Sequence, residues 1–265
     1  MSRAKDEGRL RYFPKFPSRY LSTSRDLVVY LPPGYDSGAA TRYPVLYLQD
    51  GQNLFDPATA FAGNDWKADL TADQLIRHGC IPPLLIVGIH NTGAKRISEY
   101  TPTRDKGRRK GGKADRYAQM LAREIKPFID REFRTYKGSE ATGVGGSSLG
   151  GLVSLECGLL YPRVFGNVAV ISPSVWWDNL VILRFVQEYA GKSRPRIWVD
   201  IGTQEGDNPH QMVMDTRMLR DTLVERGWDP GSTLSYHEVQ GASHSEHAWA
   251  ARFGFILEWM FSRRG

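Results

Sequence analysis

Short apolar stretches of strand length alternate with longer stretches of helical period along most of this chain. The expected strands cover residues 25–33, 43–51, 83–91, 141–146, 166–174, 196–203 and 233–239. The clearest helical patterns lie at residues 115–133, 150–161, 210–227 and 246–261. Strands and helices that alternate in this way form a mostly parallel central sheet with helices on both faces. The sequence therefore predicts an α/β fold.

The chain has 265 residues, which suits one domain with a sizeable apolar core. It contains no internal repeat and no linker long enough to separate domains, so we expect a single domain over residues 1–265. The segment 104–115 is rich in charge and glycine, and we expect it to be mobile.

Charge and cysteine content narrow the functional classes. The formal net charge of +6 comes from basic residues spread along the chain, so we do not expect nucleic-acid binding, although an anionic substrate would suit this charge. Residues 1–16 lack the apolar run of a signal peptide, and no stretch is long and apolar enough to span a membrane. Cys80 and Cys157 lie far apart in apolar surroundings, which favours buried free thiols. We therefore expect a cytoplasmic protein without a membrane partner.

The sequence GGSSLGG, residues 145–151, places two serines between an expected strand and an expected helix. Gly146, Ser148 and Gly150 fit the pattern G-x-S-x-G, in which glycines allow a tight turn that exposes the central hydroxyl. Ser148 is therefore the candidate nucleophile, and the amides of the following helix favour negative charge beside it. Ser147 is expected to point back into the turn. The alternative is that the glycines only pack the helix against the sheet.

A serine hydroxyl is a weak nucleophile that needs a base within hydrogen-bond reach and an acid to orient that base. The chain supplies both after expected strands, in the order serine, acid, histidine. Glu205 lies nearest the end of its strand, with Asp207 as the alternative acid. His244 is the preferred base, because His247 falls within the helix that follows.

These three residues suffice for ester hydrolysis through an acyl-serine, so we expect no metal and no organic cofactor. A metal site formed by His244, Glu246 and His247 is the alternative for this stretch. The sequence places no convincing further ligand beside it, and such a site would leave the serine turn unexplained.

Nine stretches spread over nearly the whole chain carry a family resemblance. They read VYLPPGYD, YPVLYLQDGQNLFD, IVGIHNTGAKRISEYTP, GGKADRYAQML, EIKPFIDREFRT, GGSSLGG, ISPSVWW, DIGTQEGDN and GASHSEHAWAARF. In these stretches the chain resembles the "Putative esterase" family of α/β-hydrolases, which includes enterochelin, feruloyl and acetyl-xylan esterases and mycolyltransferases. The resemblance implies the α/β-hydrolase fold and a serine carboxylesterase. It matches the family's nucleophile, acid and base to Ser148, Glu205 and His244.

The same resemblance implies an oxyanion hole made of two backbone N–H groups. One belongs to the residue after the nucleophile, Leu149, and the other to the loop that follows the early buried strand. By similarity to His-Gly-x loops the second donor is Gln52, with Asn53 as the alternative. This chain has Asp50 and Gly51 where many relatives have His-Gly.

The substrate is open at this stage. Trp176 and Trp177 follow an expected strand at the same sheet edge as the serine, where they form either an aromatic wall or part of the core, and Trp66 is expected to line the cleft. Basic residues that either attract an anionic substrate or are simply solvated are Arg96, Arg108, Arg109 and Lys110. Feruloyl esters, acetylated sugars, siderophore trilactones and small synthetic esters all fit. An acyltransferase of the same fold and a non-catalytic binding module are the alternative functions, and the oligomeric state is not predicted.

Overall fold

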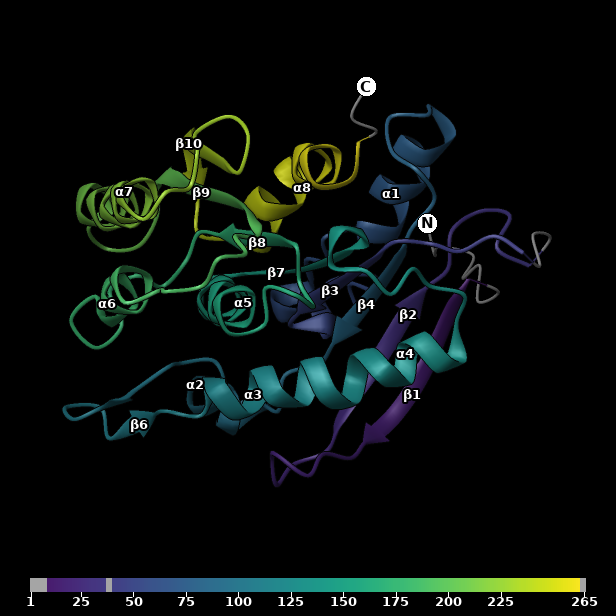
Figure 1. The fold of residues 1–265 in the computed structure, drawn as a ribbon, viewed down its shortest axis with the longest axis horizontal. Coiled ribbons are helices and arrows are strands. Elements are labelled where there is room, and N and C mark those ends of the chain that lie inside the picture. Colours follow the sequence, from purple (N-terminus) through teal and green to yellow (C-terminus); the bar gives the residue numbers. More distant parts are fainter. Residues whose placement is uncertain (1–8, 37–39, 263–265) are drawn as a thin grey trace.

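A large central sheet organises the molecule in the computed structural model, which describes residues 9–36 and 40–262. Its strands are β1 (Leu10–Phe16), β2 (Arg25–Tyr30), β3 (Val45–Gln49), β4 (Leu85–Ile89), β7 (Thr142–Ser147), β8 (Asn167–Ile171), β9 (Arg196–Gln204) and β10 (Leu234–Ser243). The 8 strands lie in the order β1-β2-β4-β3-β7-β8-β9-β10 (Figure 1). Pairings β1–β2 and β2–β4 are antiparallel, and the others in this sheet are parallel. The predicted α/β fold with a mostly parallel sheet is confirmed.

Helices cover both faces of this sheet. They are α1 (Ala68–Arg77), α2 (Arg96–Glu99), α3 (Ala114–Met120), α4 (Lys126–Glu132), α5 (Leu149–Leu160), α6 (Val181–Gln187), α7 (Pro209–Glu225) and α8 (Glu246–Phe261). A π-helical segment, η4 (Leu121–Ile125), joins α3 and α4 into one long helix. Figure 1 shows α1 and α8 on one side of the sheet and α3, α4 and α5 on the other.

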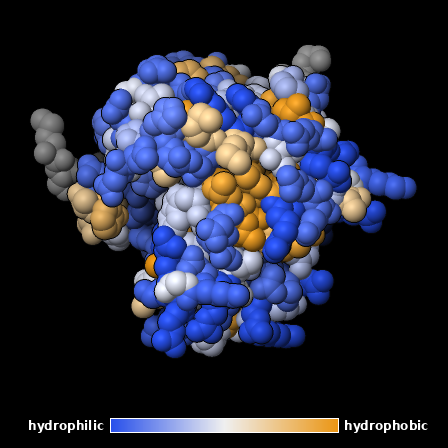
Figure 2. All heavy atoms as spheres, turned by 90° about the vertical axis from the view of Figure 1, so that its left-hand side faces the viewer, coloured by the Kyte–Doolittle hydropathy of each residue, from blue (hydrophilic) through white to orange (hydrophobic). Residues whose placement is uncertain are grey.

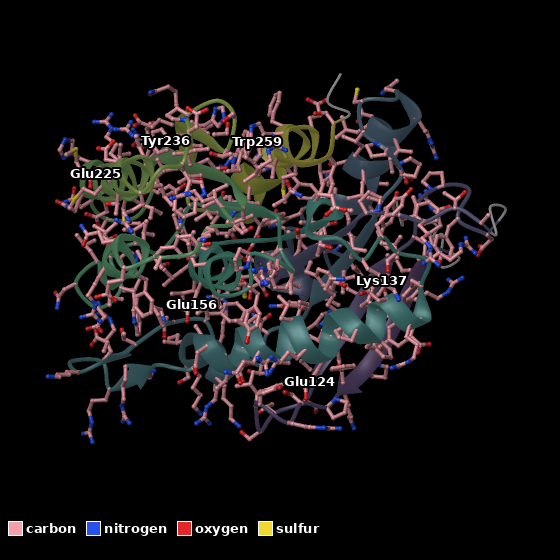
Figure 3. All side chains as sticks on the ribbon, in the orientation of Figure 1. Glu124, Lys137, Glu156, Glu225, Tyr236 and Trp259 are labelled. Carbon is pink, nitrogen blue, oxygen red and sulfur yellow. The ribbon has the colours of Figure 1, made fainter. Side chains whose placement is uncertain are left out.

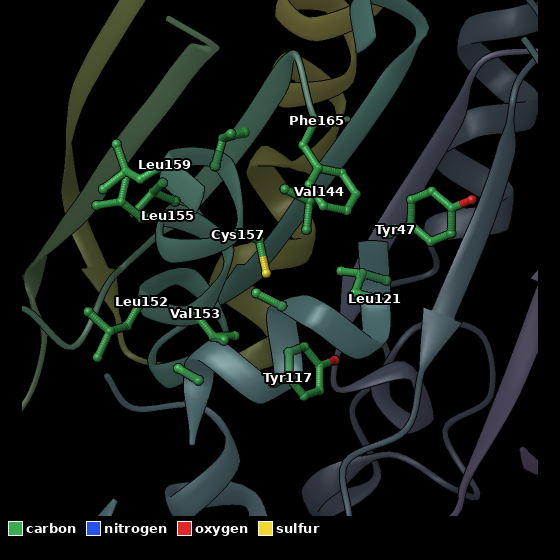
Figure 4. Packing of buried hydrophobic residues seen from close by; sticks show 14 of the residues in the cluster. Tyr47, Tyr117, Leu121, Val144, Leu152, Val153, Leu155, Cys157, Leu159 and Phe165 are labelled. Carbon is green, nitrogen blue, oxygen red and sulfur yellow. The ribbon is translucent and has the colours of Figure 1, made fainter. Parts of the chain in front are cut away.

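Two apolar cores lie on the two faces because successive strand residues point to opposite sides. In β3, Val45 and Tyr47 belong to the core under α3, α5, α6 and α7, part of which Figure 4 shows. Leu46 and Leu48 belong to the core under α1 and α8. The central strands are buried on both faces, so the sequence shows them as continuous apolar runs rather than as alternating patterns.

Strand β1 was not predicted from the sequence. It pairs only at the edge of the sheet, and its register breaks between Phe13 and Phe16, around Pro14. Proline cannot donate a ladder hydrogen bond and is tolerated at an edge strand or an irregularity. The half-exposed pattern and the proline therefore obscured the strand.

The segment expected to be mobile forms a hairpin of β5 (Arg104–Asp105) and β6 (Lys110–Gly111). The backbone N–H of Arg108 donates to Asp105 Oδ1 at 2.6 Å and lowers the pKa of that carboxyl. The indole of Trp177 donates to the carbonyl of Thr103 at 3.1 Å. The hairpin is thereby attached to the loop that follows β8.

The prediction of two buried thiols is half wrong. Cys157 on α5 is buried, whereas Cys80 is exposed. Gly79 has a φ of 72° and turns the chain out of α1, so that Cys80 stays at the surface while the apolar residues after it, Ile81 and Leu84, are buried. Neighbouring apolar residues alone did not determine the burial of this thiol.

Glu156, labelled in Figure 3, is a buried acid on α5. Its effect on stability depends on pH. Its side chain is 3% exposed, and Oε2 has no hydrogen-bond partner among the described residues. Burial, and to a smaller extent the charge of Asp115, raise its pKa from 4.5 to about 8. A group with a raised folded-state pKa stabilises the fold fully below its unfolded pKa and loses that contribution as the pH rises through the folded one.

We therefore expect Glu156→Gln to gain stability relative to wild type by roughly 2–4 kcal/mol between about pH 5 and about pH 9. Urea unfolding at both pH values measures the difference. Glu225→Gln, at an exposed position near the end of α7, is the matched control and should show no such change. A pH-independent difference for Glu156→Gln would contradict a buried, protonated carboxyl.

Candidate active site

The candidate residues lie on loops at one edge of the sheet. Ser148 follows β7, the segment Ser172–Trp177 follows β8, Glu205 follows β9, and His244 follows β10. These strands run parallel, so their carboxyl ends share an edge, where ligands bind in open α/β sheets. Residues far apart in the sequence therefore meet there.

Ser148 occupies a strained turn between β7 and α5. Its φ of 60° and ψ of −124° are unusual for a residue with a side chain. Its N–H donates to Ile171 O at 2.9 Å and its carbonyl accepts from Ser174 N at 3.1 Å, which holds the turn in place. A Cβ at Gly146 would lie only 2.8 Å from Gln49 Cβ, so the turn needs glycine there. Ser147, in contrast, is buried.

A chain of hydrogen bonds connects the serine, the histidine and the acid. His244 Nε2 lies 3.0 Å from Ser148 Oγ, and His244 Nδ1 lies 2.7 Å from Glu205 Oε2. Glu205 is fully buried, while the imidazole is 31% exposed and so open to a substrate. The alternative acid and base, Asp207 and His247, are both exposed.

Further hydrogen bonds hold the Glu205 carboxylate. Its Oε1 accepts from Ser172 Oγ at 2.5 Å and from the N–H of Gly202 at 2.7 Å. Burial acts to raise the pKa of Glu205, but the hydrogen bonds from His244 and Ser172 outweigh it, and the pKa is lowered. The acid is therefore charged at neutral pH, as a group that orients an imidazole must be.

Ser172 supports the acid, and sequence reasoning missed it. Its Oγ accepts from Trp249 Nε1 at 2.9 Å and from Arg252 Nη2 at 2.6 Å. Both of those groups can only donate, so the hydroxyl hydrogen of Ser172 is directed to Glu205. Arg252 is fixed in turn by the buried Asp200, which accepts from its Nη2 at 2.9 Å. Trp249 and Arg252 are three residues apart, a spacing that predicts one shared face of the helix. Only the fold shows that this face contacts Ser172.

The loop after β3 and the start of α5 carry the two candidate oxyanion donors. Asp50 has left-handed backbone angles and precedes a short 3-10 turn, η1 (Gly51–Asn53). The N–H of Asn53 donates to Asp50 O at 2.9 Å within this turn, so it is already used by a hydrogen bond inside the loop. Gln52 therefore stays the preferred donor from this loop. Leu149 is the first residue of α5, where an N–H has no acceptor within the helix.

Asp50 holds this loop through its side chain. Its carboxylate accepts from Asn91 Nδ2 at 2.7 Å and, in a bidentate pair, from Arg96 Nε at 2.8 Å and Nη2 at 2.7 Å. Although burial acts to lower the pKa of Arg96, the neighbouring Asp50 charge raises it above its ordinary value. Arg96 is thus committed to the loop rather than to an anionic substrate.

The three tryptophans predicted to bind substrate differ in exposure. Trp66 and Trp177 are 3% and 1% exposed, so they offer almost no surface, whereas Trp176 is 36% exposed. Arg108 from the hairpin lies over the Trp176 ring, 5.1 Å from its centre. Figure 2 shows an apolar patch ringed by hydrophilic residues on the face that carries α6, α7 and this hairpin.

The other basic residues are at the hairpin. Arg108 forms an ion pair with Asp105 at 2.9 Å, while Arg109 and Lys110 lie exposed near its tip. Among residues 9–36 and 40–262, no group of three His, Cys, Asp or Glu side chains is arranged to hold a metal ion. Within the same residues, no helix is both long and apolar enough to cross a membrane.

Comparisons with known proteins show similarity in sequence and in fold. Residues 18–260 match the family described as "Putative esterase". The chain is 25% identical to a ferri-bacillibactin esterase of Bacillus subtilis, over 76% of this chain and 73% of the relative. It is 33% identical to an endo-1,4-beta-xylanase/feruloyl esterase of Xylanibacter ruminicola, over 72% of this chain and 24% of that longer protein. The fold is similar to the crystal structure of the BES protein from Bacillus cereus, with a TM-score of 0.75, 22% identity and coverage of 96% and 95% of the two chains.

Proposed function

Because the chain belongs to the "Putative esterase" family, it is a carboxylic ester hydrolase, and we propose that Ser148, His244 and Glu205 are its catalytic triad. The observation that supports this most directly is the unbroken hydrogen-bond chain Ser148 Oγ–His244–Glu205, with distances of 3.0 and 2.7 Å. The family resemblance of the sequence motifs is confirmed by the match to residues 18–260.

In the proposed mechanism, His244 Nε2 takes the hydroxyl proton of Ser148 as Oγ attacks the ester carbonyl. The backbone N–H groups of Leu149 and Gln52 stabilise the oxyanion that forms. His244 then protonates the departing alkoxide, which leaves as the alcohol, and the acyl group stays on Ser148. A water molecule, deprotonated by His244, attacks the acyl-serine; the acid is released as the acyl–Oγ bond breaks, and His244 returns the proton to Ser148 Oγ.

Glu205 supports this cycle by accepting a hydrogen bond from the N–H of His244 Nδ1. That hydrogen bond keeps the lone pair of Nε2 facing Ser148 and stabilises the imidazolium that forms in each transition state. Ser172 and Gly202 occupy Oε1 of the carboxylate, so its other oxygen is the one aimed at His244.

For the substrate, we propose a small-molecule ester that carries an aromatic acyl group. The name of one relative, an endo-1,4-beta-xylanase/feruloyl esterase, suggests an ester of this kind. In this chain Trp176 is the exposed aromatic surface on the loop after β8, and Arg108 lies beside its ring. An aromatic acyl group can stack on such a surface.

Trp176→Ala should raise KM for methyl ferulate by about 2- to 12-fold, because a stacking contact contributes about 0.5–1.5 kcal/mol. KM for an acetylated sugar, which has no aromatic ring, should change little. Steady-state kinetics on both substrates measures the difference. Trp176→Phe should restore most of the affinity, and Tyr136→Ala, at another exposed aromatic position, should have no effect.

The proposed function is tested by hydrolysis of a substrate panel: p-nitrophenyl acetate, methyl ferulate, acetylated xylan and a catechol trilactone. We expect turnover of at least one, with methyl ferulate, the ester with an aromatic acyl group, preferred. The panel is repeated with added alcohol or sugar, because an acyltransferase would form a new ester in preference to the free acid. No turnover, or products dominated by transfer, would contradict a hydrolase.

A further inference from the structure

Glu246 is a partly buried acid that the proposed mechanism does not use. It begins α8 two residues after His244, yet its carboxylate contacts the other side of the site. Oε1 accepts from Asn53 Nδ2 at 2.8 Å, and Oε2 accepts from the indole N–H of Trp66. One short segment of chain thus carries the histidine and is also bonded to the oxyanion loop.

Every polar group of Asn53, in the backbone and in the side chain, forms a hydrogen bond. Its backbone N–H donates to Asp50 O at 2.9 Å and its backbone carbonyl accepts from Trp66 N at 2.8 Å. Its side-chain oxygen accepts from Phe61 N at 3.0 Å, and its side-chain amide donates to Glu246. Asn53 directly follows Gln52, so the position of the Gln52 amide depends on these bonds.

We propose that Glu246 is a positioning residue that joins the two halves of the active site, holding the oxyanion loop through Asn53 at a set distance from His244. This inference rests on the proposed function, since it concerns the same reaction. It also accounts for Trp66, which is nearly buried and offers no surface to substrate but supplies the second hydrogen bond to Glu246.

The ionisation state of Glu246 governs this contact. The Asn53 amide and the Trp66 indole both donate, so only the ionised carboxylate can accept from both without a surplus hydrogen. The charged groups that face it are Asp50, Arg96 and His244. Burial is the strongest influence, and although Trp66 opposes it, burial and Asp50 together raise the pKa of Glu246 to about 7. As the pH falls through this value, Glu246 takes up a proton and one of the two bonds is lost.

Kinetics of Glu246→Gln as a function of pH tests the inference. We expect kcat to fall about 10- to 100-fold with KM changed less than about 3-fold, because misplacement of catalytic groups affects the transition state more than binding. The acidic limb of the wild-type pH profile includes protonation of Glu246, so this limb should become less steep in the variant. Glu258→Gln, the same substitution near the other end of α8, should leave both kcat and the limb unchanged.

Asn53→Ala removes the other partner of the Asn53–Glu246 hydrogen bond. This variant tests the inference even if Glu246→Gln folds poorly. It should lower kcat to a similar extent, and the loss in the double variant should be smaller than the product of the two single losses, since both variants disrupt the shared Asn53–Glu246 contact. Additive losses, or a wild-type kcat and pH profile in both single variants, would overturn the inference. Ser148→Ala distinguishes failure of the proposed function from failure of this inference. If Ser148→Ala stays active, the proposed function is wrong. If it is inactive while the Glu246 and Asn53 variants have normal kinetics, only the role of Glu246 is wrong.

Discussion

Ser148→Ala should lower kcat/KM by about 10³- to 10⁶-fold on every ester that the wild type hydrolyses. Among the hydrogen bonds of the described residues, Ser148 Oγ is the only hydroxyl oxygen bonded to His244 Nε2, at 3.0 Å, and the variant removes it. It keeps the turn, because the backbone bonds to Ile171 and Ser174 do not involve the side chain. Steady-state hydrolysis together with a thermal melt measures both effects, and the melting temperature should stay near that of the wild type.

Two neighbouring hydroxyls provide the controls. Ser147→Ala removes the adjacent serine, which is buried, and should retain most activity. Ser174→Ala removes a hydroxyl 3.3 Å from Ser148 Oγ and should lower activity far less than Ser148→Ala does. If Ser147→Ala is inactive and Ser148→Ala is active, the wrong serine has been assigned as the nucleophile.

Glu205→Gln should lower kcat by about 10²- to 10⁴-fold while leaving KM nearly unchanged. The amide of glutamine can turn a donor toward His244 Nδ1, which favours the tautomer with its hydrogen on Nε2 and removes the acceptor for the Ser148 proton. The neutral side chain also no longer stabilises the imidazolium. In addition, the glutamine side chain has one acceptor oxygen in place of the two carboxylate oxygens. That one oxygen would still have to accept from Ser172 and Gly202.

Asp207→Asn is the matched control for this loss, because it makes the same chemical change two residues away at an exposed position. It should keep wild-type kcat. The rates of both variants and of the wild type are measured at neutral pH. Glu205 is charged there in the wild type, because its pKa is lowered. An inactive Asp207→Asn beside an active Glu205→Gln would show that the acid has been misassigned.

Much of the fold was predictable because its strongest signals are local. Buried parallel strands appear as apolar runs such as Val45–Gln49, and long helices such as Pro209–Glu225 show a clear helical period. Short or irregular elements carried weaker signals: β1 contains a proline, and the hairpin at 104–111 has strands of only two residues. The exposure of Cys80 likewise depends on a turn and not on the apolar residues around it.

The sequence by itself determined the alternation of strands and helices, the turn that strains Ser148, and the chain order in which a serine, an acid and a histidine follow the ends of strands. These are properties of neighbouring residues, since glycine spacing and apolar period act within a few positions. Tertiary structure decided which distant groups meet: Ser172 and Arg252 at Glu205, Asn53 and Trp66 at Glu246, and Arg96 at Asp50. Such contacts arise when parallel strands bring their carboxyl ends to one edge, and no local pattern encodes the resulting distances.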